Sequence, residues 1–152
     1  MKKELSFEKI ALKYGLLATV GLIVYFLIMK LLGLIYIVEL RVFNFLILSY
    51  CVWRALTEFI KQTEDEMVYL RTLVLGVFTS LIATLPFAIF IFIYMNYDSA
   101  FMAHIIEYEM FGRYLNPYII SFLIFFEGMI SGYFIAYVLM QYMKKTYLKR
   151  TY

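Results

Sequence analysis

The sequence predicts an all-α, polytopic membrane protein, folded as a bundle of four transmembrane helices within a single integral membrane domain, residues 1–152. Two observations support this class. The chain is 64% hydrophobic and only 16% charged, whereas a soluble domain has roughly 45–50% apolar and about 25% charged residues. Its apolar residues also form four runs of the roughly 20 residues that a helix needs to cross a bilayer. The expected spans are residues 13–33, 37–57, 72–96 and 118–142.

The first span contains "YGLLATVGLIVYFLIM", between Lys13 and Lys30. Lys2 and Lys3 precede it, as basic residues precede the core of a signal peptide. However, the lead-in "MKKELSFEKIALK" carries acids as well as bases, the apolar run exceeds a typical signal core, and no small-residue cleavage site closes it. We therefore expect the first span to be retained as an anchor.

The second span has a start that the sequence leaves open. The run "GLIYIVELRVFNFLILSYCVW" is apolar except for Glu39, Arg41 and Asn44. The turn that precedes this helix can therefore lie anywhere from Gly33 to Arg41.

The third span follows the polar stretch "TEFIKQTEDEMVYLR", which reads as a connecting loop. Pro86 lies inside this span, where it removes one backbone hydrogen bond and is expected to kink the helix. Both a static bend and a moving hinge are compatible with the kink. The fourth span opens with Asn116 and Pro117.

A short amphipathic helix is predicted in the loop between the third and fourth spans. Asp98 or Ser99 can cap its start, and Gly112 can end it. Its apolar stripe consists of Phe101, Met102, Ile105, Ile106 and Met110. The segment is too short and too charged to span, so we expect it along the outer interface or over the bundle mouth. It would there cover helix ends, or act as a gate or docking surface.

The distribution of basic residues predicts the orientation. With both termini in the cytoplasm, eleven of the 14 Lys and Arg residues lie inside, as the positive-inside rule requires. The three outside are Lys30, Arg41 and Arg113. Tyrosines and Trp53 near the expected helix ends are typical of an aromatic belt. We therefore expect the protein in the bacterial inner (cytoplasmic) membrane.

Small residues at intervals of four predict the faces through which helices pack, because lipid offers no hydrophobic drive for association and close backbone approach is needed. These residues are Gly76, Ser80, Thr84 and Ala88 in the third span and Gly128, Gly132 and Ala136 in the fourth. At about 100° per residue, Glu127 and Ser131 share the small half of the fourth helix. The other half carries Phe122, Phe126, Met129, Tyr133 and Met140. Glu127 is thus expected to point toward protein. Together with Ser131 and the seven small residues of the third and fourth spans, it forms the predicted helix-packing or partner interface.

Glu127 is a chargeable group in an apolar span. Its insertion cost of about 2.5–3.5 kcal/mol is offset by apolar neighbours that each contribute about 0.3–0.6 kcal/mol. Three interpretations stay open: a contact within or between chains, a proton or cation relay, and an incidental polar residue. Possible partners are Arg54 near the inner surface and Lys30, Glu39 and Arg41 near the outer one. Arg54 is itself expected to extend to the interface and contact Glu58, four residues on.

The composition argues against an enzyme. One cysteine, Cys51, and one histidine, His104, lie on different segments without partners for catalysis, for a metal site or for a bound cofactor. No basic patch of the nucleic-acid-binding kind is present. We expect a noncatalytic accessory or assembly subunit that packs against itself or a larger membrane complex. The alternative is a small oligomeric transporter or channel with Glu127 as its proton or cation site.

Three segments, "KYGLLATVGLIVYFLIM", "WRALTEFIK" and "LRTLVLGVFTSLIAT", resemble a family of uncharacterised small four-helix inner-membrane proteins from Bacteroidota. The likeness extends over most of the chain and is mainly one of hydropathy. This sequence differs from the family in its acidic "KQTEDEM", where a Gly-rich approach to the third helix would be expected. The resemblance implies a topology and no particular activity.

Overall fold

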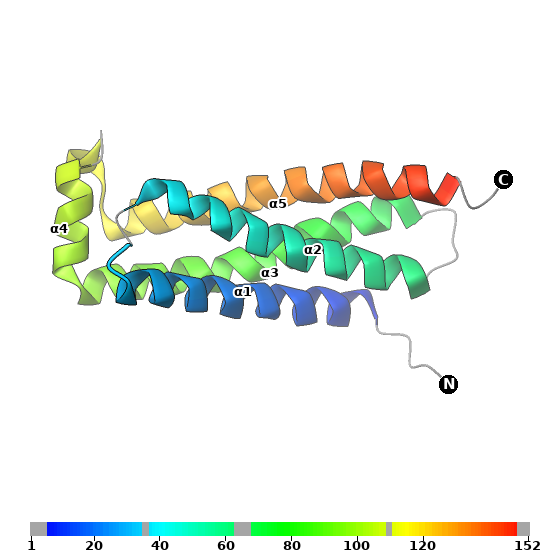
Figure 1. Ribbon diagram of the computed structural model, residues 1–152, viewed down its shortest axis with the longest axis horizontal. Helices are drawn as coiled ribbons and strands as arrows, with labels where there is room; N and C mark the ends of the chain where they lie inside the picture. The colour runs from blue at the N-terminus through cyan, green and yellow to red at the C-terminus, as the bar shows by residue number, and fades with distance from the viewer. Residues whose placement is uncertain (1–5, 35–36, 63–67, 109–110, 149–152) are drawn as a thin grey trace.

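The computed structural model describes residues 6–34, 37–62, 68–108 and 111–148. Every regular element in these ranges is helical, as the sequence predicts. Figure 1 shows four long helices side by side and one short helix, α4, across one end. The long helices are α1 (Phe7–Leu31), α2 (Val42–Gln62), α3 (Val68–Tyr97) and α5 (Pro117–Leu148), and the shorter elements are η1 (Val38–Arg41), α4 (Ser99–Tyr108) and η2 (Gly112–Tyr114).

Four helical segments are long and apolar enough to cross a membrane. They are Phe7–Leu31, Val42–Gln62, Leu70–Tyr97 and Pro117–Met143. Large apolar side chains are exposed along all four helices, for example Val24, Leu46, Ile93 and Phe134. Apolar surface of this extent is typical of contact with lipid or with other proteins, and together with the four apolar helices it indicates a membrane-integrated protein.

The turn between α1 and α2 is set by Gly33, which has a φ of 71°. A glycine takes this left-handed conformation without steric cost. The Gly33 N–H donates to the Lys30 carbonyl at 3.0 Å, and the Leu34 N–H donates to the Met29 carbonyl at 2.9 Å. The chain then forms η1, so α2 begins at Val42, five residues after the expected start of the second span.

Pro86 lies inside α3 and frees a backbone acceptor, because proline has no N–H for the Ile82 carbonyl four residues earlier. Thr19 of α1 lies opposite this point. Its hydroxyl is 3.3 Å from the Ile82 oxygen and 3.1 Å from the Ala83 oxygen. A hydroxyl from a neighbouring helix is one of the groups that make proline tolerable in a membrane helix.

The interior is divided into two clusters along the long axis. One lies in the half where α1 begins and α5 ends, called here the basic half, and its buried side chains come from α1, α2, α3 and α5. The other lies in the half capped by α4, called here the α4 half. Its buried side chains are Leu22, Phe87, Ile91, Met95, Phe101 and Ile105, from α1, α3 and α4.

Asp98 caps the start of α4, one of the two residues expected to do so. Its Oδ1 accepts the Phe101 N–H at 3.2 Å, and its Oδ2 accepts the Tyr94 hydroxyl at 2.7 Å and lies 3.4 Å from Lys30 Nζ. The helix ends at Tyr108, before Gly112, which lies in η2. Met110 of the expected stripe is outside the described residues.

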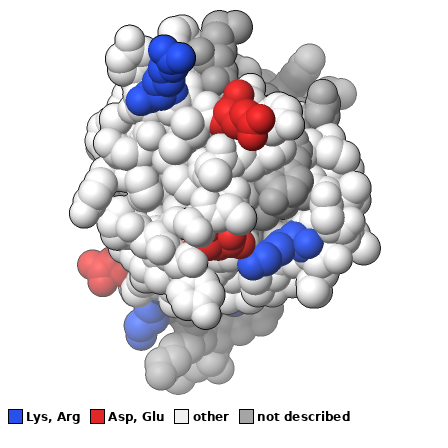
Figure 2. Space-filling model, turned by 90° about the vertical axis from the view of Figure 1, so that its left-hand side faces the viewer, with Lys and Arg blue, Asp and Glu red and all other residues white. Residues whose placement is uncertain are grey.

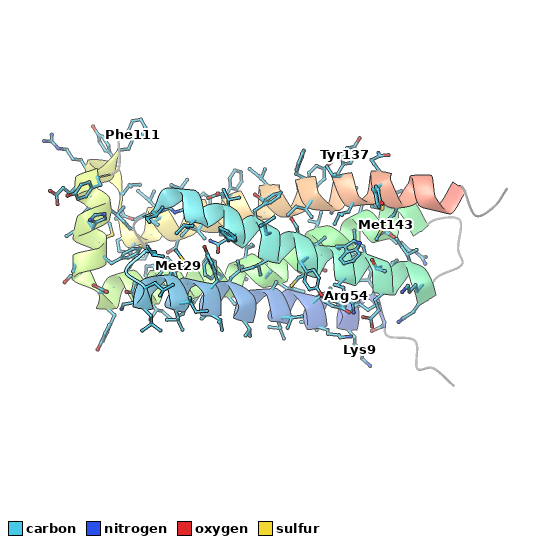
Figure 3. All side chains as sticks on the ribbon, viewed as in Figure 1. Lys9, Met29, Arg54, Phe111, Tyr137 and Met143 are labelled. Atoms are coloured by element: carbon cyan, nitrogen blue, oxygen red, sulfur yellow. The ribbon has the colours of Figure 1, made fainter. Side chains whose placement is uncertain are left out.

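Charged side chains are sparse on the surface of the α4 end, where most residues are of other kinds (Figure 2). Lys9 and Arg54 lie toward the opposite end (Figure 3). There Glu58 pairs with Lys13 of α1 at 3.1 Å and accepts a hydrogen bond from Tyr14. These hydrogen bonds of Glu58 thus come from α1, and Arg54, the expected contact, acts on the same carboxylate through its charge.

Candidate functional site

The α3–α5 contact brings together six of the nine residues of the predicted interface. A side chain added at Gly128 would overlap Thr84, one at Gly132 would overlap Ser80, and one at Gly76 would overlap Ala136. The backbones of α3 and α5 approach closely because these positions are small. Ala88, a further residue of the predicted interface, is buried on α3.

The hydroxyls of this contact are satisfied within α3. Ser80 donates to the Gly76 carbonyl and Thr84 donates to the Ser80 carbonyl, each at 2.9 Å. Hydroxyls that return to their own helix need no donor or acceptor from a partner. The small faces are thus used inside the chain, between α3 and α5.

Glu127 lies at the edge of this contact, and its side chain is exposed. The expectation that it points into protein is therefore corrected. One residue corresponds to about 100° around a helix, so the contact through Gly128 and Gly132 turns Glu127 toward the flank of α5. Ser131 is half-buried beside it. Met140, expected on the opposite half, is buried because it continues the row of Gly132 and Ala136.

A cavity of about 430 Å³ lies in the α4 half, between α2 and α5. Its walls are mainly apolar and include Leu48 of α2, Phe87 of α3 and Ile124 of α5. Phe101 and Ile105 of α4 also line it. Met29, labelled in Figure 3, contributes to its wall from α1. The buried side chains of the core cluster in this half come from α1, α3 and α4. The cavity therefore lies between α2 and α5, the two helices whose described residues contribute no buried side chain to that cluster.

A second cavity of about 510 Å³ adjoins the first. The two share the lining residues Arg41, Ile105, Ile120, Ile124, Glu127 and Ser131. The second is also lined by Leu123, Phe126 and Ile130, all of which are exposed on α5. The two cavities together, called here the α2–α5 cavity, therefore reach the outer flank of the molecule.

Three polar residues give the α2–α5 cavity its chemistry. Arg41 lies at the start of α2, Asn44 is less than one turn further along, and Glu127 faces them from α5. The Oδ1 atom of Asn44 is buried without a hydrogen-bond partner in the described part of the chain. Such an orphaned acceptor is destabilising by about 1–3 kcal/mol unless a ligand or water supplies a donor. Thr84 and Tyr25 also line the cavity, but their hydroxyls donate to backbone carbonyls.

The sequence makes Arg41 a poor partner for Glu127 and gives Asn44 no role. The feature that could identify Arg41 and Asn44 as site residues is that these two polar residues interrupt an apolar run close to a helix start. Arg54, the other candidate cation, lies toward the basic half (Figure 3), and it is not among the residues that line the cavity.

Within the described ranges, no group of three His, Cys, Asp or Glu residues is placed to hold a metal ion. His104 is on α4 and stacks on Tyr108 with ring centroids 4.2 Å apart. No protein-family model, curated protein or solved structure matches the chain. The function of the protein is therefore inferred from the arrangement of its own residues.

Proposed function

We propose that the protein is a noncatalytic integral membrane subunit that packs through Glu127 and the exposed face of α5 against another membrane helix. That helix belongs to a second copy or to a larger membrane complex. The observation that carries this proposal is the exposed Glu127 side chain in the middle of an apolar span.

The depth of Glu127 makes its exposure unfavourable in lipid. It lies ten residues after Pro117, the first residue of α5, which corresponds to about 15 Å along the helix axis. The hydrocarbon core is about 30 Å thick and the span is longer than that, so the carboxyl group lies inside the core, in the half nearer the α4 end. Arg41 lines the same cavity, but a carboxylate offers about four acceptor positions. A hydrogen-bond donor from a neighbouring helix would stabilise it further.

The exposed side of α5 supplies the surface for such a helix. Large side chains project from it, among them Phe122, Phe126, Tyr133 and Tyr137, the last of which is labelled in Figure 3. Because the small residues of α5 pack on α3, the partner is recognised by these large side chains and by Glu127. This differs from the sequence expectation, in which small residues and Glu127 served the partner together.

The arrangement of the ends supports an orientation with both termini cytoplasmic in the bacterial inner membrane. Lys9, Lys13, Lys61 and Arg71 belong to the ends of helices in the basic half. Positive residues favour the cytoplasmic side. In this orientation α4 lies at the outer interface, with Phe101 and Ile105 turned inward.

The test is purification of the full chain in a mild detergent, with the particle mass measured by light scattering. We expect a wild-type particle larger than one chain, dissociation in Glu127→Leu, and retention in Glu127→Gln, because the amide still forms hydrogen bonds. The matched control is Glu107→Leu, at an exposed position on α4. A strictly monomeric wild type without a partner, together with unchanged behaviour of Glu127→Leu, would contradict the proposal.

A transporter or channel is the second candidate, favoured by the polar groups of Arg41, Asn44 and Glu127 on one cavity. In this function, Glu127 would bind a proton or cation in a water-accessible site. Vesicles containing the purified protein should then take up protons or monovalent cations, and Glu127→Gln should abolish the uptake. Absence of flux in the wild type would exclude this function.

A further inference from the structure

The α2–α5 cavity combines features that a membrane protein would use to hold a lipid. Its walls are apolar, its polar groups are few, and it reaches the exposed flank of α5. We propose that it binds a phospholipid of the leaflet at the α4 end, with a head that carries both a phosphate and an N–H-bearing ammonium group. The phosphate lies against Arg41, and the ammonium group donates to Asn44 and Glu127.

The apolar walls and the lateral opening identify the occupant as a lipid chain. Ligand cavities of this kind usually have volumes of about 300–1,000 Å³, and the larger share of the lining of the 430 Å³ cavity is apolar. In a bilayer, the neighbours of the flank between α2 and α5 are acyl chains. A chain can enter there without crossing a polar barrier, because Leu123, Phe126 and Ile130 form that side.

The position and chemistry of Arg41 indicate that the lipid head carries a phosphate. It lies at the junction of η1 and α2, near the end of a span, where lipid heads begin. Its guanidinium group has five N–H donors in a planar fork that matches phosphate oxygens. Arg41 already takes part in an interaction within the chain, and its planar fork of donors allows a phosphate to join that contact.

Asn44 and Glu127 identify the ammonium group. The Asn44 Oδ1 acceptor has no partner, and it lies three residues from Arg41, a rise of about 4.5 Å along the helix. The Asn44 side chain lines the cavity, and its terminal amide torsion is broad, so a partial rotation would bring the buried oxygen to the cavity wall. Glu127 presents carboxyl oxygens on the facing helix. A head with N–H donors satisfies both residues, whereas a quaternary ammonium has no N–H to offer.

The decisive experiment compares two heads of equal charge, one with three N–H donors and one with three methyl groups in their place. Full-length protein is reconstituted into vesicles of equal phosphatidylethanolamine and phosphatidylcholine with identical acyl chains, extracted in mild detergent, and its retained lipids are quantified by mass spectrometry. We expect roughly tenfold enrichment of phosphatidylethanolamine, the factor supplied by one charge-assisted hydrogen bond. Equal retention of the two lipids would overturn the proposal.

A methylation series tests the same point on the wild-type protein alone. Retention should fall from phosphatidylethanolamine through its N-monomethyl and N-dimethyl forms to phosphatidylcholine, because each step removes one donor. A third head, phosphatidylglycerol, has hydroxyl donors and a net negative charge. Its retention above phosphatidylethanolamine would reject the ammonium assignment, and preference independent of methylation would do the same.

Variants assign the contacts. Asn44→Leu should reduce the preference, because only Glu127 then accepts from the ammonium group, while Asn96→Leu, at an exposed asparagine outside the cavity, should keep the full preference. Arg41→Gln should lower the retention of both lipids and leave their ratio unchanged. A preference that is the same in Asn44→Leu as in the wild type would overturn the site.

The lipid site shares Glu127 and Phe126 with the proposed partner surface, whereas Asn44 belongs to the lipid site alone. Asn44→Leu should reduce lipid preference without changing particle mass, and Glu107→Leu should change neither. A monomeric wild type that still retains phosphatidylethanolamine would remove the proposed function and leave the lipid site intact.

Discussion

The two halves of the molecule differ in how α2 and α5 meet the other helices. In the basic half, the core includes Leu56 of α2 and Ala136 of α5, both fully buried. In the α4 half, the buried core is formed by α1, α3 and α4, and α2 and α5 enclose a cavity that contains Arg41 and Glu127. The difference shows that the helices of this membrane fold pack tightly where small residues line their contact. Where larger and polar residues take their place, a cavity remains between the helices.

The largest expected difference between the two halves is the change in stability when one side chain in each half is enlarged. Gly132→Ala places a Cβ on Ser80, so we expect a loss of about 1–3 kcal/mol in stability. Ile124→Phe adds volume toward the cavity, and we expect a change within about 0.5 kcal/mol. Unfolding in detergent micelles, followed by circular dichroism, measures both.

Gly21→Ala serves as the matched control for the glycine substitution. There an added Cβ meets only the side chain of Ile47, at 3.0 Å. A loss for Gly21→Ala as large as that for Gly132→Ala would show that helix flexibility, and not the α3–α5 contact, sets the result.

Thr19 and Pro86 join α1 to α3 near the boundary of the two halves. Thr19→Val should lower stability by about 0.6–1.7 kcal/mol, the range for hydrogen bonds between membrane helices. In a Pro86→Ala background the same change should cost less, because the alanine N–H can pair with the Ile82 carbonyl. A double-mutant cycle of unfolding free energies measures the coupling. Additive effects would mean that Thr19 does not serve the proline site.

The smallest effect is expected at the α3–α4 junction, from Asp98. The Tyr94 hydroxyl, the Phe101 N–H and Lys30 hold the pKa of Asp98 below its usual value. Stability linked to a lowered acid pKa is present above the usual value, about 3.9, and is lost as the pH falls through the lowered one. The protection factor of the Phe101 amide against hydrogen exchange should therefore fall below about pH 4.

Asp98→Asn is the control for this titration, since it can cap α4 but has no proton to gain. In this variant the protection factor of the Phe101 amide should lose its acid step. A step that persists would assign the titration to another group.

Hydropathy and short-range spacing were enough to predict the helical class and the cap at Asp98, because both depend on neighbours in the sequence. The start of α2 was not predictable, because the turn at Gly33 and the helix η1 use residues of a run that is apolar apart from Glu39 and Arg41. Nor could Glu58 be paired with Lys13, 45 residues away. The meeting of Arg41, Asn44 and Glu127 depends on how far α2 and α5 separate and on their relative heights. No local pattern encodes either quantity.

The Thr19 hydroxyl has a consequence for biosynthesis. Translation delivers α1 before α3, so the group that accommodates the proline defect is already in the bilayer when Pro86 enters it. A chain that lacks its first segment would insert α3 with a bare carbonyl in lipid. In this respect α1 supplies a group that α3 uses when it inserts into the membrane.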